Sequence, residues 1–262
     1  MSTPTRSAST WSEGSAHFPP HTVKSRFYGV PSKNRDFVDR SEIISNMKAE
    51  LDKSSSGECG ILALRGLGGI GKTQLMLHYC YNHFQSYKWV FWLEVDSWSA
   101  AVDSFRKLAI NLGLGKEIIE EMDSEEEIIE WVRIWLQTNE DWLLLLDNAD
   151  GEMADKVFKL LPCIGGDIII TTREPIHSSL ATVISVDKMK KEEALTLLLG
   201  VSSMDSVEDA KIQLAQQIIT ELDCMPLALH LARAYVNNTQ NSFQQYLEKL
   251  KTQRKKLLEY NE

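Results

Sequence analysis

The stretch GLGGIGKT, residues 66–73, decides the fold of this chain. It matches the pattern G-x-x-x-x-G-K-[ST], follows the apolar run ILALR at 61–65, and precedes a helical pattern that extends through Tyr81. Glycines let a backbone turn its N–H groups inward around a polyphosphate, and the positive end of the next helix faces the same group. The pattern therefore predicts a phosphate-binding loop between a buried strand and a helix.

Two side chains at the end of this loop carry its chemistry. Lys72 is predicted to reach the β- and γ-phosphates as a point charge, and the Thr73 hydroxyl is predicted to ligate Mg²⁺. We therefore include Lys72 among the catalytic candidates. The residues predicted to bind the nucleotide in this segment are Gly66, Gly68, Gly69, Ile70, Gly71, Lys72, Thr73 and Gln74.

Strand and helix patterns alternate on either side of the loop. Continuous apolar runs bounded by turn residues are typical of strands that are buried on both faces. Strands that alternate with helices predict an α/β fold of the P-loop NTPase type, with a parallel sheet flanked by helices. The predicted strands are 61–65, 88–95, 141–147, 167–172 and 182–186, and the predicted helices between them include 99–114 and 124–138.

The strand pattern stops near residue 187. Four helical patterns follow, at 190–200, 210–222, 226–238 and 242–260, and they predict a small all-α subdomain. Pro226 suits the first position of its helix. The predicted organisation is a disordered arm at 1–25, a nucleotide-binding domain at 26–187 and a helical subdomain at 188–262.

The segment before the first predicted strand has a weaker pattern. Residues 26–40 are predicted to form a loop, and 41–52 a helix that Ser41 caps. The serine-rich stretch 54–57 ends this helix. Within the loop, the segment FVDR ends at Arg40.

Asp147 closes the apolar run LLLL at 143–146. A carboxylate at the end of a buried strand suits the Mg²⁺-linked acid of a P-loop protein, so Asp147 and Thr73 are the predicted metal ligands. Asn148 follows where a hydrolytic enzyme often has a second carboxylate, and an amide cannot take a proton from water. Asp150 is an alternative acid for that role. Whether the chain is an enzyme stays open, and we expect at most a weak ATPase.

A third polar segment, Thr171-Thr172-Arg173, ends the strand predicted at 167–172. Ligands of parallel sheets bind beyond the carboxyl ends of the strands. Arg173 is accordingly predicted to sense or neutralise a γ-phosphate, and it joins Lys72 and Asp147 as a catalytic candidate.

Composition excludes several classes of protein. The 262 residues include 28 Lys and Arg against 37 Asp and Glu, which gives a net charge of −9 and disfavours broad binding to nucleic acid or anionic membranes. No apolar run is long enough to span a membrane. The four cysteines form no C-x-x-C pair, so we expect reduced thiols and a cytoplasmic protein.

Four segments in this order resemble the NB-ARC domain of the STAND class of signalling ATPases: GLGGIGKT, LLLLDNAD, DIIITTREP and CMPLAL. This class includes plant resistance proteins, animal apoptosome proteins and fungal NLR-like proteins, and the chain looks most like the fungal members. The resemblance covers about residues 30–262.

The resemblance implies a role for each matching residue. Asp147 is similar to the Walker B acid, and Arg173 to sensor 1, which reads the γ-phosphate. Pro226 matches the proline that packs against adenine from the helical subdomain. Val38 and Arg40 match the segment that borders the base and ribose. The implied ligands are ADP or ATP with Mg²⁺.

The chain also departs from the family pattern. Asp39 and Cys224 stand where the family usually has glycine, and Asn148 replaces the second acid. The chain ends where the winged-helix subdomain of the family begins. The histidine that contacts the ADP β-phosphate in that subdomain has no counterpart here.

The resemblance implies a molecular switch in signalling, of an innate-immunity or cell-death kind, with slow or absent hydrolysis. ADP holds the two subdomains closed, ATP reorganises them, and the open form self-associates or binds protein partners. The alternative is a nucleotide-binding adaptor, or a truncated part of a larger NLR-like receptor, that acts through protein association. A small-molecule phosphotransferase is a third hypothesis, but the sequence has no arginine-rich lid segment to support it.

Overall fold

The computed structural model describes residues 25–53, 59–162, 164–177, 179–201, 203–205, 207–239 and 241–259. The predicted arm, apart from Ser25, lies outside the described residues. So do the predicted helix break at 54–57 and Cys163.

Strands of the described part form one parallel sheet in the order β1-β3-β4-β5-β2-β6. The predicted α/β fold with a parallel sheet is confirmed. Because all strands run the same way, the segments that follow β2, β4 and β5 meet at the same end of the sheet, beyond the carboxyl ends of the strands. The strands are β1 (Phe27–Tyr28), β2 (Gly60–Arg65), β3 (Trp89–Glu94), β4 (Trp142–Asp147), β5 (Gly166–Thr172) and β6 (Thr182–Ser185).

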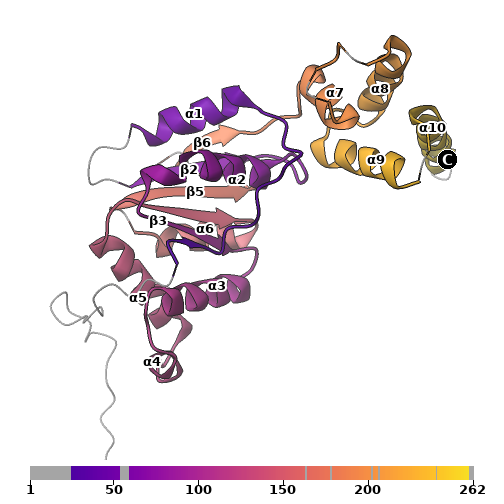
Figure 1. Cartoon of the computed structure of the whole chain (residues 1–262). Coiled ribbons are helices and arrows are strands. Elements are labelled where there is room, and N and C mark those ends of the chain that lie inside the picture. The colour runs from indigo at the N-terminus through magenta and orange to yellow at the C-terminus, as the bar shows by residue number, and fades with distance from the viewer. Residues whose placement is uncertain are drawn as a thin grey trace, which may run out of the picture.

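Helices cover both faces of the sheet (Figure 1). The central strand β4 shows why, because its six residues are all buried and its leucines alternate between two cores. Leu144 and Leu146 face the core under α3, α5 and α6, whereas Leu143 and Leu145 face the core under α1 and α2. The helices are α1 (Ser41–Leu51), α2 (Lys72–His83), α3 (Trp98–Asn111), α4 (Lys116–Glu120), α5 (Glu125–Thr138) and α6 (Glu152–Leu160).

Several local predictions were wrong. Residues 26–40 are not all loop, because β1 pairs with β3 at the edge of the sheet. Such a two-residue strand depends on its partner and has no pattern of its own. The helix at α1 forms as predicted, but Arg40 and not Ser41 is its N-cap, and no side chain caps it. Helices α4 and α6 were not predicted, since each is short and rich in charge.

A second group of helices lies beyond the end to which the strands point (Figure 1). These helices pack around their own core, which includes Met189, Leu198, Ile218 and Leu229. Pro226 is the first residue of its helix, as predicted. No helix among the described residues is long and apolar enough to cross a lipid bilayer. The four helices are α7 (Lys191–Leu199), α8 (Asp209–Glu221), α9 (Pro226–Thr239) and α10 (Phe243–Glu259).

Candidate functional site

A cavity of about 350 Å³ lies where the phosphate-binding loop meets the loop before α1 and the helices α7 and α9. This volume is within the range of small-molecule sites in proteins. Of the residues predicted to form the site, only Gly66 and Asp147 do not line the cavity. The predicted residues that line it are Val38, Arg40, Gly68, Gly69, Ile70, Gly71, Lys72, Thr73, Gln74, Arg173 and Pro226.

The loop between β2 and α2 wraps around the cavity because of its glycines. Gly69 has φ +75° and Gly71 has φ +97°, in a region that side-chain-bearing residues rarely adopt. Gly71 is the N-cap of α2, so the first turn of this helix starts at the cavity wall. Unpaired N–H groups and the helix dipole make such a turn a site for anions.

Lys72 is a buried cation at the base of the loop. Its Nζ donates hydrogen bonds to the carbonyl oxygens of Gly66 at 2.9 Å and Leu67 at 3.1 Å. No carboxylate of the described residues lies within ion-pair distance of it. Burial lowers the pKa of Lys72 below the usual lysine value. The ammonium group therefore has no ion-pair partner among the described residues, and a phosphate in the cavity would supply one.

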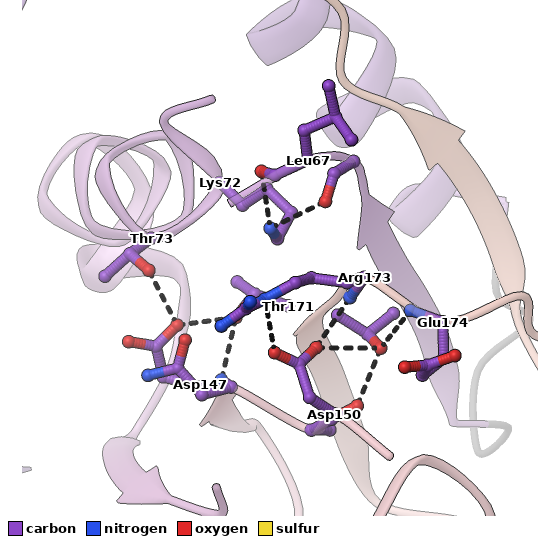
Figure 2. A network of polar contacts seen from close by, with 12 residues as sticks. Leu67, Lys72, Thr73, Asp147, Asp150, Thr171, Arg173 and Glu174 are labelled. Carbon is purple, nitrogen blue, oxygen red and sulfur yellow. Dashed lines mark hydrogen bonds and ion pairs between the residues drawn. The ribbon is translucent and has the colours of Figure 1, made fainter. Parts of the chain in front are cut away.

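Asp147 lies below the loop, where it joins three elements (Figure 2). Its Oδ1 accepts hydrogen bonds from Thr73 Oγ1 at 2.8 Å and from Thr171 Oγ1 at 2.5 Å. Burial raises the pKa of Asp147, and the two hydroxyls partly oppose that shift. The geometry brings together the two predicted Mg²⁺ ligands from β4 and α2. Magnesium is commonly held by one or two protein ligands together with phosphates and water, and this pair fits that chemistry.

Arg173 reaches the cavity from the end of β5. Its Nε lies 2.7 Å from Asp150 Oδ2, and its backbone N–H donates to Asp150 Oδ1 at 2.6 Å. A Cβ atom built on Gly68 would lie 3.6 Å from Arg173 Nη1, so the guanidinium lies beside the phosphate-binding loop. Both oxygens of Asp150 are engaged by Arg173. Asp150 is therefore held in an ion pair with Arg173, and its role as the alternative acid stays a prediction.

Arg40 lines the cavity but turns its guanidinium toward protein groups. Nη2 donates to the Asp187 carbonyl at 2.7 Å, Nη1 lies 3.4 Å from the Ile70 carbonyl, and Nε lies 3.5 Å from Glu193 Oε2. Burial lowers the pKa of Arg40. This side chain thus connects the phosphate-binding loop with the start of the helical layer, a role that the sequence did not predict.

Several residues of the cavity were missed by the sequence analysis. Leu227 and His230 follow Pro226 on α9 and line the cavity with it. Phe37 lines it from the loop before α1 and stacks on His78, with ring centroids 4.1 Å apart. The signals available were the helical spacing from Pro226 to His230 and the position of Phe37 next to Val38, and neither identifies a cavity wall by itself.

The NB-ARC domain model matches residues 40–208 of the chain. A nucleotide-binding leucine-rich repeat (NLR)-like protein of Hyaloscypha variabilis is 24% identical over 87% of this chain and 25% of its own length. The regulatory protein AfsR of Streptomyces griseus is 26% identical over 78% of this chain and 21% of its own length. The chain thus spans about a quarter of the length of these curated relatives.

The fold is also similar to solved structures. The crystal structure of Cdc6p from Pyrobaculum aerophilum matches 80% of this chain and 66% of its own chain, with a TM-score of 0.57 and 12% identity. At that identity the likeness concerns the fold alone.

Proposed function

Because the chain belongs to the NB-ARC family, a family of nucleotide-binding signalling domains, we propose that it is a molecular switch that binds ADP or ATP with Mg²⁺. In this proposal Lys72 and the loop backbone hold the phosphates. Thr73 and Asp147 hold the metal ion, and the loop at 37–40 and Pro226 border the base and ribose. The output is protein association in a signalling role, of an innate-immunity or cell-death kind.

One observation carries the proposal: the cavity is shared between the phosphate-binding loop and the helical layer. The backbone N–H of Leu227 on α9 donates to the Gly69 carbonyl at 3.2 Å. A Cβ on Gly69 would lie 3.0 Å from the Leu227 Cβ, so glycine permits this close approach. A ligand that changes the loop would therefore change its contact with α9.

A switch requires contacts that differ between the two nucleotides, because a ligand shifts an equilibrium only by its differential affinity. Arg173 is the candidate, since its guanidinium lies beside Gly68 at the cavity wall. In this proposal Arg173 binds the γ-phosphate, which ADP lacks.

Hydrolysis is proposed to be slow. Asn148 lines the cavity next to Asp147, but its amide accepts no proton from water. The next acid, Asp150, is bound by Arg173. Losing a general base typically slows a reaction by about 10²- to 10⁴-fold.

The proposal is tested by calorimetric titration of the nucleotide-stripped protein with ADP and with a non-hydrolysable ATP analogue, with and without Mg²⁺. Lys72→Ala is expected to lower the affinity for both nucleotides by at least about tenfold, because it removes a charge-assisted phosphate contact. Lys156→Ala is the matched control, since Lys156 is an exposed lysine paired with Glu152. No binding by folded wild-type protein, or equal binding by Lys72→Ala, contradicts the proposal.

A second candidate is a nucleotide-binding adaptor that acts mainly through protein association. Its supporting observation is a set of exposed apolar side chains near the cavity: Leu67 is 64% exposed, Leu227 53% and Leu231 58%. Light scattering in ADP and in the ATP analogue separates the two candidates. Association that depends on the nucleotide favours the switch, and association that does not depend on it favours the adaptor.

A further inference from the structure

The segment after β4 is hydrogen-bonded along the end of β5. Asn148 N–H donates to Thr171 Oγ1 at 2.9 Å, and Ala149 N–H donates to the Thr171 carbonyl at 2.9 Å. Thr172 Oγ1 donates back to the Ala149 carbonyl at 2.6 Å. These bonds fix the backbone that carries Asp150 relative to the backbone that carries Arg173.

Asp150 then holds Arg173 at two points. One carboxylate oxygen accepts the backbone N–H of Arg173 at 2.6 Å, and the other lies 2.7 Å from its Nε. Figure 2 shows the two side chains facing each other below the phosphate-binding loop. A contact through Nε constrains the plane of the guanidinium and leaves donors on its terminal nitrogens.

The contact matters because, within the part of the chain that the structure describes, no other ion pair or hydrogen bond holds the Arg173 side chain. Its side chain is 63% exposed, whereas that of Asp150 is 24% exposed. A long exposed arginine samples many rotamers, and ordering it costs binding free energy when a ligand requires one of them. Asp150 orders it beforehand, with Nη1 next to Gly68 at the cavity wall.

We propose that Asp150 is a positioning residue for nucleotide discrimination, which holds the Arg173 guanidinium toward the γ-phosphate position. This inference rests on the proposed function, because it assigns to Asp150 the orientation of the residue proposed to distinguish ATP from ADP. Asp150 does not itself touch the nucleotide, and its carboxylate acts through Arg173.

The experiment measures the ratio of the dissociation constants for ADP and a non-hydrolysable ATP analogue, by calorimetry on the full chain. Arg173→Ala is expected to change this ratio in favour of ADP by about tenfold or more, because the dissociation constant of the ATP analogue rises when a charge-assisted contact is lost. Asp150→Ala is expected to shift it in the same direction by about threefold to tenfold, the effect of ordering one long side chain. The dissociation constant for ADP is expected to change little in Asp150→Ala.

Three further variants separate positioning from charge. In the Arg173→Ala background, Asp150→Ala is expected to cause no further shift toward ADP. Glu152→Ala removes an exposed carboxylate nearby that pairs with Lys156, and it is expected to leave the ratio unchanged. Asp150→Asn keeps one acceptor for the Arg173 N–H but loses the charged contact with Nε. It should reproduce the shift, and it replaces Asp150→Ala if that variant does not fold.

The outcomes distinguish the inference from the function on which it rests. A shift with Arg173→Ala but none with the Asp150 variants overturns the positioning role and leaves sensing by Arg173 intact. An equal Asp150→Ala shift in both backgrounds also overturns it, since the carboxylate then acts by its own charge. No shift with Arg173→Ala overturns the proposed sensing itself.

Discussion

At the scale of single residues, the site combines charges that the fold keeps out of water. Lys72 has backbone carbonyls as its hydrogen-bond partners, and Asp147 is buried under two threonine hydroxyls. Neither arrangement is the most stable one for a charged group. Such sites exchange stability for ligand affinity, because a bound phosphate or cation supplies the missing counter-charge.

Asp147→Asn tests this exchange. Burial raises the pKa of Asp147 in the folded protein, so the ionised carboxylate destabilises the fold at pH values above that pKa. Asparagine keeps an Oδ1 acceptor for Thr73 and Thr171. We expect a higher melting temperature for the ligand-free variant at neutral pH, and loss of the Mg²⁺-dependent part of nucleotide binding.

The sign of the pH dependence follows from the same shift. As pH falls through the raised pKa, wild-type Asp147 gains its proton and the penalty disappears, so the stability advantage of the variant should shrink on acidification. Thermal unfolding followed at several pH values measures this. A constant difference across the pH range would contradict the expectation.

At the scale of elements, α9 has two different faces. Leu229 is fully buried in the core that α7, α8 and α9 share. Leu231, two residues later, is 58% exposed, and Pro226, Leu227 and His230 line the cavity. One helix therefore both anchors the helical layer and closes the site.

Leu229→Ala and Leu231→Ala form a matched pair on this helix. The first leaves a cavity in a packed core and is expected to lower the free energy of unfolding by about 2–5 kcal/mol. The second is expected to change it by no more than about 0.5 kcal/mol. Chemical denaturation measures both, and a loss for Leu229→Ala as small as that expected for Leu231→Ala would show that this core contributes little.

The position of Cys80 on a buried helix face determines the reactivity of its thiol. Cys80 lies on α2 in the core under the sheet, and burial raises the pKa of its thiol to about 12. A thiol that stays protonated is a poor nucleophile. We expect Cys80 to resist alkylation at pH 8 in the native protein and to react after denaturation, as mass spectrometry of labelled peptides would show.

At the scale of the whole molecule, the α/β layer and the helical layer meet around the cavity. Leu227 contacts the loop at Gly69, and Arg40 connects Ile70 with Asp187 and Glu193. These contacts surround the cavity, so a nucleotide there would stabilise the junction, by an amount that grows with the logarithm of its free concentration above the dissociation constant.

Arg40→Ala tests the junction. It removes a buried cation with several partners, and we expect the free energy of unfolding to fall by about 2 kcal/mol, with faster proteolysis near residues 187–190. Arg254→Ala removes an exposed ion pair with Glu221 and is the control. Unchanged proteolysis in Arg40→Ala would mean that other contacts hold the layers together.

The sequence by itself determined the α/β class, the strands that flank the phosphate-binding loop and the residues of that loop. Such features depend on local patterns: apolar runs, helical spacing and glycines that only certain turns require. The spacing of residues 61–65, 66–73 and 141–147 was enough to place Lys72 and Asp147 at the same edge of the sheet.

Only the tertiary structure decided the rest. It inserted β5 between β2 and β4, which brings Thr171 to Asp147 and Arg173 to Gly68. It also paired Arg173 with Asp150 and turned Arg40 toward the helical layer. The physical reason is that strand order and the partners of long charged side chains depend on contacts between residues far apart in the chain, which no local pattern encodes.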